Sequence, residues 1–528
     1  MDMKFDDLTY MIGQLLFMDD IKLYSPSSGQ LQSMVRTVEL VANDVGLTFG
    51  LSKCAVLHMV CGRIDYKDPI LGCSGQEFQQ LDRGGYYKYL GFMEATDVPH
   101  ETIKSSLMHE FGIRLKQLLE SHLNAGNLAR AVNCYALPVL SYSFGIIHWT
   151  RHELKQIDRM FRKTLTDYGV LHPRAAVERL YLARKNGGRG FLLAEELHDR
   201  IVLGIYQYLC KEAEHSPRLA LLLQHHGHRK VHSVVKCATE FAIILMPEGN
   251  ASTLGKATIK EKCHEKKMVS LREKPLHGQF WVRADRVGVN LDLSFSWLRA
   301  AMLKPSSEGK VLAAQDQALS TRNLQAVWGR AAGGGDADAM CRLCKQSRET
   351  IDHVVGACPQ LAATLYVERH NRVVKVVHWH ICKENNIPVK ARSPSHHSLC
   401  PVSTSTDGNK VLWECTIPTA GTVTANRPDL VLHRGNCVYL IDISVPLDAN
   451  VGTKIIEKKL KYEALRVEVS RAWQCKDVVV VPVVIGALGA VTTECEKEIQ
   501  KLIKVKLQEL QGEVLLGTTK ILDTVLAL

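Results

Sequence analysis

Residues 427–446, RPDLVLHRGNCVYLIDISVP, restrict the local fold more than any other stretch of the chain. They contain two apolar, β-rich runs, 430–433 and 437–441, separated by the turn signal Arg-Gly-Asn. This pattern predicts an antiparallel β-hairpin. Asp429 and Asp442 are about equally far from the turn, so the hairpin would make them cross-strand neighbours with Cβ atoms roughly 5 Å apart.

Two carboxylates at that distance repel each other unless a cation lies between them. Carboxylate oxygens suit Mg²⁺ or Mn²⁺, which would activate water and stabilise charge on a scissile phosphate, so Asp429 and Asp442 are candidate catalytic metal ligands. A lysine is expected to complete such a site. Lys458 and Lys461 lie on a predicted helix over 453–473, which would bring an ammonium group back to the end of the hairpin. The alternative is an ordinary hairpin whose end aspartates are solvated turn residues.

The composition favours a multidomain protein with a polyanionic partner. A chain of 528 residues that is 46% hydrophobic is long enough for three or four domains with sizeable cores. Its formal charge of +11 favours nucleic acid as the partner. The 16 cysteines form no dense framework, so reduced thiols in the cytosol or nucleus are expected. The longest apolar run, 478–491, is short and interrupted by Pro482, which indicates a buried strand and no membrane span.

Near the start of the chain, residues 11–24, MIGQLLFMDDIKLY, predict a second hairpin with Asp19 and Asp20 at its tip. Paired aspartates are also common in plain turns. A helix capped by Ser27 or Ser28 is expected to follow. The segments GLTFGLSKC and YYKYLGF come next in the chain.

Residues 100–215 are predicted to be helical, most clearly over 101–123 and 153–167. The junction at 171–191 combines glycines with basic residues. Glycine lets a backbone approach closely and arginine grips phosphate, so this junction is a candidate nucleic-acid surface, although a basic helix-to-loop junction would look similar. The candidate binding residues are Arg174, Arg179, Arg184, Lys185 and Arg189. A basic helical stretch is expected over 256–272.

Directly after Gly333, Gly334 and Gly335, which predict a flexible joint, comes CRLCKQSRETIDHVVGAC. Its four candidate ligands form a Cys-x2-Cys-x8-His-x4-Cys pattern, and three thiolates with one imidazole close a tetrahedral structural zinc site. Chance clustering of cysteines is the alternative. The predicted zinc ligands are Cys341, Cys344, His353 and Cys358.

The HWHIC segment that follows suggests a second metal site at His378, His380 and Cys382. A packed amphipathic helix over 360–382 is the preferred interpretation.

Together these segments resemble the later part of the polyprotein of non-LTR retrotransposons of the class that carries a restriction-like endonuclease. The resemblance implies that Phe-Met-Asp-Asp at 17–20 belongs to a reverse transcriptase palm, with Asp19 and Asp20 at its catalytic metal site. It also implies that Lys53 ends a Gly-x-x-Lys-type segment and that 87–91 is the primer grip.

The C-terminal region resembles the endonuclease of those elements, a member of the PD-(D/E)XK fold, through RPD, twelve residues, Asp442 and then KKLKYEAL. The resemblance implies that Asp429 and Asp442 bind Mg²⁺ or Mn²⁺, that Lys461 is a displaced catalytic lysine and that Tyr462 lies beside the site. A zinc knuckle is implied just before the nuclease. A strand over 478–485 and a helix over 494–510 would complete the nuclease core.

The predicted fold is therefore α+β and multidomain. The implied parts are a partial reverse transcriptase palm (1–95), a helical thumb and basic junction (96–215), a helical linker region (216–335), a CCHC zinc knuckle (336–362) and an α/β restriction-like endonuclease core (363–528).

In the family, the nuclease nicks a DNA site, and the exposed 3′ hydroxyl primes reverse transcription of the bound element RNA. Target DNA and element RNA are the implied partners, with no membrane, and the nucleus is the implied compartment, with the cytoplasm during synthesis. Polymerase activity is expected to be lost, because only eighteen residues precede Asp19 and the fingers and an upstream palm aspartate are missing. The alternatives are a decayed or repurposed nucleic-acid-binding protein without catalysis and an incomplete gene model.

Overall fold

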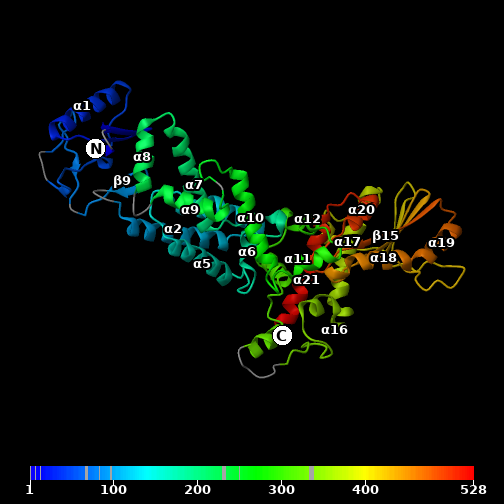
Figure 1. Ribbon diagram of the computed structural model, residues 1–528. Helices are drawn as coiled ribbons and strands as arrows, with labels where there is room; N and C mark the ends of the chain where they lie inside the picture. The colour runs from blue at the N-terminus through cyan, green and yellow to red at the C-terminus, as the bar shows by residue number, and fades with distance from the viewer. Residues whose placement is uncertain are drawn as a thin grey trace. The chain divides into compact units, whose positions relative to one another are not determined.

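The computed structural model describes residues 2–5, 8–11, 13–65, 69–82, 84–94, 98–228, 233–248, 250–331 and 338–528. The protein is mixed α/β, with many helices and small sheets (Figure 1). It divides into two compact units that alternate along the chain: unit 1 is Met1–Arg114, Ala136–Ile157 and Ala194–Ile259, and unit 2 is Leu115–Tyr135, Asp158–Leu193 and Lys260–Leu528. The domain boundaries expected near 95, 215, 335 and 362 stay predictions. The glycines of the predicted joint, Gly333 to Gly335, lie outside the described residues.

In unit 1, the hairpin predicted at residues 11–24 is confirmed. β3 (Gln14–Phe17) and β4 (Asp20–Leu23) pair antiparallel around a turn at Met18 and Asp19. The second aspartate of the pair begins β4. The hairpin forms a separate two-stranded sheet, and no other described strand pairs with its outer edges.

Local capping and turn signals explain the next elements. Ser27 caps α1 (Ser28–Asp44), because its hydroxyl oxygen accepts a hydrogen bond from Gln30 N. The YYKYLGF segment forms a short hairpin of β9 (Tyr87–Tyr89) and β10 (Phe92–Glu94). The remaining strands before residue 90 are β1 (Asp2–Phe5), β2 (Leu8–Met11), β5 (Ala55–Val56), β6 (Met59–Val60), β7 (Arg63–Ile64) and β8 (Gln79–Gln80).

The predicted helical region after residue 100 is confirmed, and the basic stretch over 256–272 is a helix. The described helices from there to residue 331 are α2 (His100–Glu120), α3 (Ala125–Ala131), α4 (Pro138–Ser141), α5 (Arg151–Asp167), α6 (Val177–Tyr181), α7 (Ala194–Ala213), α8 (Pro217–His228), α9 (Val234–Leu245), α10 (Lys256–Arg272), α11 (Gln279–Arg286), α12 (Leu291–Ser294), α13 (Ser296–Ala300), α14 (Pro305–Gln315) and α15 (Arg322–Ala331). No helix among the described residues is both long enough and apolar enough to span a membrane.

The main sheet of unit 2 has five strands in the order β11-β12-β13-β14-β15. β11 (Val402–Thr404), β12 (Lys410–Trp413), β13 (Leu430–Arg434) and β14 (Cys437–Ser444) pair antiparallel, and β15 (Asp477–Val484) pairs parallel with β14. The hairpin predicted from 427–446 is β13 with β14, and the strand predicted over 478–485 is β15. Gly435 adopts a positive φ in the two-residue turn, where a side chain would be strained.

Alternate residues of the strands point to opposite faces of this sheet. One face, which includes Leu432 and Ile441, packs against α17 (Leu365–Glu384), α18 (Val451–Lys461), α20 (Thr493–Leu502) and α21 (Leu507–Leu526). The other face, which includes Val431 and Leu440, packs against α19 (Glu463–Ala472). In Figure 1, β15 lies beside α18 and α19.

Three segments of this unit that were each predicted to form one continuous helix are instead divided into two helices. The helix expected over 453–473 is two helices, α18 and α19, which meet at Tyr462 because they pack on opposite faces of the sheet. The helix expected over 494–510 is likewise broken between α20 and α21. The helix expected over 360–382 is a short α16 (Pro359–Ala362) followed by α17.

Candidate functional site

The two predicted metal ligands lie at the open end of the β13–β14 hairpin. Leu430 pairs with Ile441, so Asp429 and Asp442 occupy the next cross-strand position outward. Asp442 belongs to β14, where strand alternation directs it toward the face that includes Leu440, whereas Asp429 directly precedes β13. The backbone N–H of the residue after Asp442 donates a hydrogen bond to Asp429 Oδ2 at 2.6 Å. The negative charges of both carboxylates act on the same two side chains, His370 and Tyr462, and contribute to raising the pKa of each.

Asp442 is the more enclosed of the two, with 3% of its side chain exposed. Lys458 Nζ lies 2.5 Å from Asp442 Oδ2, whereas Lys461 Nζ lies 3.6 Å from Oδ1. Both lysines come from α18, three residues apart on one helix face. The resemblance selected Lys461, but the geometry places the ammonium group of Lys458 closer to the carboxylate.

Tyr462 lies beside this pair, as the resemblance implied. Its ring is buried at the break between α18 and α19, and its hydroxyl donates a hydrogen bond to Asp442 Oδ1 at 2.5 Å. Lys461 Nζ donates to the same hydroxyl oxygen at 2.9 Å. Burial, together with the negative charge of Asp442, raises the pKa of Tyr462 above its usual range, so the phenol stays a hydrogen-bond donor.

The sequence interpretation missed one residue of this site, His370 on α17. His370 Nε2 lies 3.1 Å from Asp429 Oδ2, and His370 Nδ1 lies 3.1 Å from Asn371 Oδ1. Burial alone would lower the pKa of His370, but the hydrogen bond to Asp429 and its negative charge outweigh that effect and raise it. No local pattern distinguishes His370 among the chain's 22 histidines, because its partner lies 59 residues further along the chain.

The donor chemistry of this pair fits a hard divalent cation, since Mg²⁺ and Mn²⁺ prefer carboxylate oxygens. Asp442 Oδ2 is buried, and its contact with Lys458 is an ion pair without hydrogen-bond geometry. The hydrogen bonds that described residues make to the Asp429 carboxylate go to Oδ2, which leaves Oδ1 for a ligand. The ammonium group of Lys458 would compete with a metal cation for the negative charge of Asp442. Within the described chain, no third acidic, histidine or cysteine side chain joins these two in a compact ligand set.

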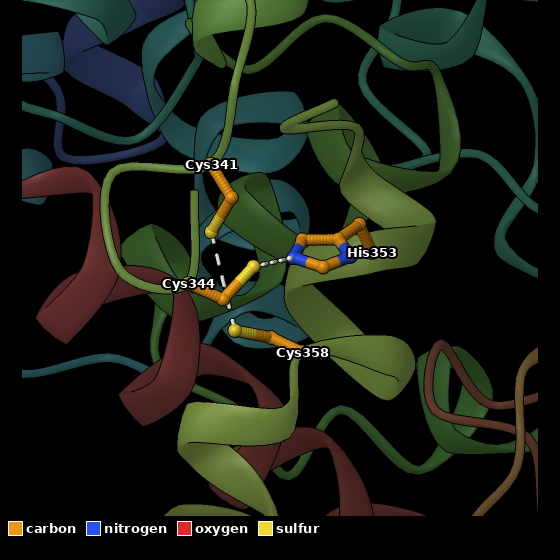
Figure 2. A group of neighbouring side chains, drawn as sticks. All are labelled: Cys341, Cys344, His353 and Cys358. Carbon is orange, nitrogen blue, oxygen red and sulfur yellow. Dashed lines mark hydrogen bonds between the residues drawn. The ribbon is translucent and has the colours of Figure 1, made fainter. Parts of the chain in front are cut away.

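The Cys-x2-Cys-x8-His-x4-Cys residues form a compact buried cluster. One ligand atom from each of Cys341, Cys344, His353 and Cys358 lies within 4.8 Å of the other three. Figure 2 shows the three sulfur atoms and the imidazole pointing toward one another. Cys344 Sγ is 3.3 Å from His353 Nε2, and Cys341 Sγ is 3.9 Å from Cys358 Sγ. This arrangement can hold a metal ion with soft thiolate and imidazole ligands.

The surroundings of the cluster favour a thiolate at Cys344 more than at Cys358. Burial alone would raise the pKa of Cys344, but hydrogen bonds from the backbone amides of Gln346 and Ser347 outweigh it and lower the pKa. Burial raises the pKa of the Cys358 thiol to about 11. A cation among the sulfur atoms would favour the thiolate at both positions.

The HWHIC segment is a packed helix, as preferred. His378 and Cys382 are buried on α17, and His378 Nδ1 lies 2.7 Å from His397 Nε2. Burial lowers the pKa of His378 to about 4 and raises that of Cys382 to about 12, so both side chains are neutral at pH 7.

Three of the five predicted phosphate-binding residues form ion pairs with buried carboxylates, which occupy their guanidinium groups. Arg179 is 2% exposed and pairs with Asp316 at 2.7 Å. Arg184 and Arg189 both pair with Glu308, at 2.5 and 3.1 Å. A buried guanidinium needs a carboxylate partner to compensate its lost hydration, which explains these pairs.

The other two basic residues of this junction remain exposed. The guanidinium of Arg174 lies 3.4 Å from the ring centroid of Trp328, a cation–π contact that leaves the side chain at the surface. Lys185 is exposed as well. These two side chains stay candidates for nucleic-acid binding.

Asp19 and Asp20 are exposed at the β3–β4 hairpin. The structure places them at the tip as predicted. No third metal-binding side chain gathers with them among the described residues.

No protein-family model matches the chain, and no curated protein matches it. Functional inference therefore depends on the two candidate sites of unit 2: the carboxylates of the β13–β14 hairpin and the Cys3His cluster.

Proposed function

We propose that this chain is the C-terminal portion of a non-LTR retrotransposon polyprotein and that unit 2 contains its DNA-nicking nuclease. One observation carries the proposal: Asp429 and Asp442 lie at the open end of one hairpin, with Lys458 and Tyr462 against Asp442. Bound Mg²⁺ or Mn²⁺ would neutralise charge on the scissile phosphate and make a bound water molecule more acidic.

Each side chain of the site would have its own role in the reaction. Asp429 and Asp442 would hold the cation. Lys458 supplies a positive charge next to the same carboxylate, where it would stabilise negative charge developing on the phosphate oxygens. The protonated Tyr462 hydroxyl holds Asp442 Oδ1 and thereby fixes the rotation of that carboxylate.

The finer architecture belongs to the same proposal. The Cys3His cluster would be a structural zinc knuckle before a restriction-like endonuclease core, and residues 1–95 a partial reverse transcriptase palm. The partners would be target DNA and element RNA, in the nucleus. Support comes from the buried ligand set and from the net positive charge of the chain.

A second candidate is a repurposed nucleic-acid-binding protein without catalysis. It is favoured by the charge balance at Asp442, where two lysines and a tyrosine hydroxyl already compensate the buried carboxylate without a divalent ion.

Nicking of supercoiled plasmid by the purified chain distinguishes these candidates. The intact protein is compared with Asp442→Asn, which preserves the shape of the side chain, and with Asp477→Asn, an exposed aspartate at the start of β15. The nuclease proposal expects nicking that requires Mg²⁺ or Mn²⁺, is lost in Asp442→Asn and persists in Asp477→Asn. Retarded but uncut plasmid with all three proteins would support the non-catalytic candidate.

A further inference from the structure

We propose that His370 is a positioning residue that orients the Asp429 carboxylate for metal binding. The inference rests on the nuclease proposed above, and it assigns a role to a side chain outside every sequence motif of the chain.

Two donors from different elements converge on one oxygen of Asp429. Ile443 N, on β14, lies 2.6 Å from Oδ2, and His370 Nε2, on α17, lies 3.1 Å from the same atom. A carboxylate held through one oxygen by two donors loses its freedom to rotate. Its Oδ1, which takes none of the hydrogen bonds made by described residues, is then presented in one direction.

The imidazole is itself held by a rigid element. Its Nδ1 faces Asn371 Oδ1 at 3.1 Å, and a quarter of the side chain is exposed. On the same helix, Val373, Val374 and Val377 are buried in the core against the sheet. Helix packing therefore fixes the position from which His370 reaches Asp429.

This arrangement predicts an effect on metal affinity more than on the chemical step. Partners that hydrogen-bond to metal ligands typically change metal affinity about 10- to 100-fold when they are removed. Loss of His370 should therefore raise the metal concentration needed for half-maximal nicking by about that factor. The nicking rate at saturating metal should change much less, since Asp442, Lys458 and Tyr462 keep their contacts.

The same helix offers a matched control. His380 Nε2 lies 3.1 Å from Glu509 Oε2, the same kind of pair at the same distance, with 18% of the histidine side chain exposed. His380→Ala removes a histidine–carboxylate contact from α17 away from the hairpin. His370→Gln is the conservative variant, because its amide N–H can still donate to a carboxylate oxygen.

The test uses the full chain without DNA and measures Mn²⁺ binding from the loss of the free-ion electron paramagnetic resonance signal, together with nicking as a function of Mn²⁺. We expect weaker binding by about 10- to 100-fold in His370→Ala, recovery to within a few-fold in His370→Gln and unchanged binding in His380→Ala.

Each contrary result has a distinct meaning. Wild-type Mn²⁺ affinity in His370→Ala would overturn the positioning role while leaving the nuclease proposal intact, provided that Asp442→Asn still abolishes binding. Equal losses in His370→Ala and His380→Ala would overturn it too, because the cause would then be a weakened helix. Absence of Mn²⁺ binding by the wild-type protein would overturn both proposals together.

Discussion

The ammonium group of Lys458 lies 2.5 Å from Asp442 Oδ2, with 17% of the lysine side chain and 3% of the aspartate side chain exposed. Lys461, three residues further on the same helix, is 42% exposed, and its ammonium group donates a hydrogen bond to the Tyr462 hydroxyl. Ion pairs gain strength as their surroundings exclude water. Lys458 is therefore the cation that most strongly compensates Asp442.

Replacing Lys458 should consequently impair nicking more than replacing Lys461. A hydrogen bond or contact to a charged group contributes about 1.5–3 kcal/mol, which corresponds to roughly 10- to 100-fold in rate if it acts in the transition state. We expect a loss of that size in Lys458→Ala and only a few-fold loss in Lys461→Ala, measured as single-turnover nicking rates at saturating metal.

Lys454→Ala provides the control, because Lys454 lies on the same helix and pairs with the exposed Glu457. Its rate should equal that of the wild type. A full loss in Lys461→Ala beside a mild effect in Lys458→Ala would contradict the assignment and favour the lysine that the family resemblance selected.

Removal of metal from the Cys3His cluster should destabilise unit 2. Metal binding to such a cluster contributes directly to folding free energy. We expect one zinc per chain by mass spectrometry, loss of that zinc in Cys344→Ser, and a fall in melting temperature of roughly 10 °C. Cys134→Ser, which changes an exposed thiol, should keep both the zinc and the melting temperature. Unaltered zinc content in Cys344→Ser would exclude the cluster as the binding site.

Glu308 should be a strong determinant of stability, because it compensates two guanidinium groups at once. Its side chain is 1% exposed and pairs with Arg184 and Arg189. Glu308→Gln leaves both cations without a charged partner, and breaking a buried pair costs about 3–5 kcal/mol of unfolding free energy. Urea unfolding followed by tryptophan fluorescence measures the change.

The matched variant is Glu368→Gln, which breaks an exposed pair with Lys520 in the same unit. It should cost less than about 1 kcal/mol. Similar stabilities for the two variants would mean that the buried network contributes little, and that Arg184 and Arg189 could be recruited by other partners.

The stability of unit 2 should decrease as the pH rises from about 4 to about 7, because of Asp448. Burial raises the pKa of this carboxyl group to about 7, although hydrogen bonds from the amides of Leu488 and Ala490 act in the opposite direction. The folded state then binds more protons than the unfolded state over this range, so folding is favoured at low pH. Three pKa units correspond to up to about 4 kcal/mol.

Asp448→Asn should remove this contribution, because an amide stays neutral across the range while still accepting the hydrogen bond from Leu488 N. Urea unfolding at several pH values between 4 and 8 compares the two proteins. As the pH rises, the free energy of unfolding of the wild-type protein should fall relative to that of the variant. A constant difference between the two proteins across this pH range would contradict the assignment to Asp448.

Local sequence patterns were sufficient to predict several features of the structure. Two apolar, β-rich runs around an Arg-Gly-Asn turn predicted the hairpin that carries Asp429 and Asp442, and the serines at positions 27 and 28 predicted a helix cap, which Ser27 forms. The spacing of the four cysteine and histidine ligands predicted a compact buried cluster. In each case the information lies within about twenty residues of the feature.

Other features depend on contacts that no local pattern records. Helical periodicity continues through Tyr462, and the break there follows from packing on two faces of a sheet whose strands lie elsewhere in the chain. Arg179, Arg184 and Arg189 resembled a phosphate-binding surface in the sequence because their carboxylate partners come more than a hundred residues later. His370 was missed for the same reason.

The alternation of the two units along the chain has a consequence for folding during synthesis. Arg189 leaves the ribosome 119 residues before the carboxylate of Glu308 that compensates it. At about 5–20 residues per second, that interval is roughly 6–24 s. Throughout this interval the guanidinium has to stay hydrated, so residues 158–193 cannot reach their native burial until translation has passed position 308. A ribosome stalled before this point would display an unfinished unit 2 open to chaperones.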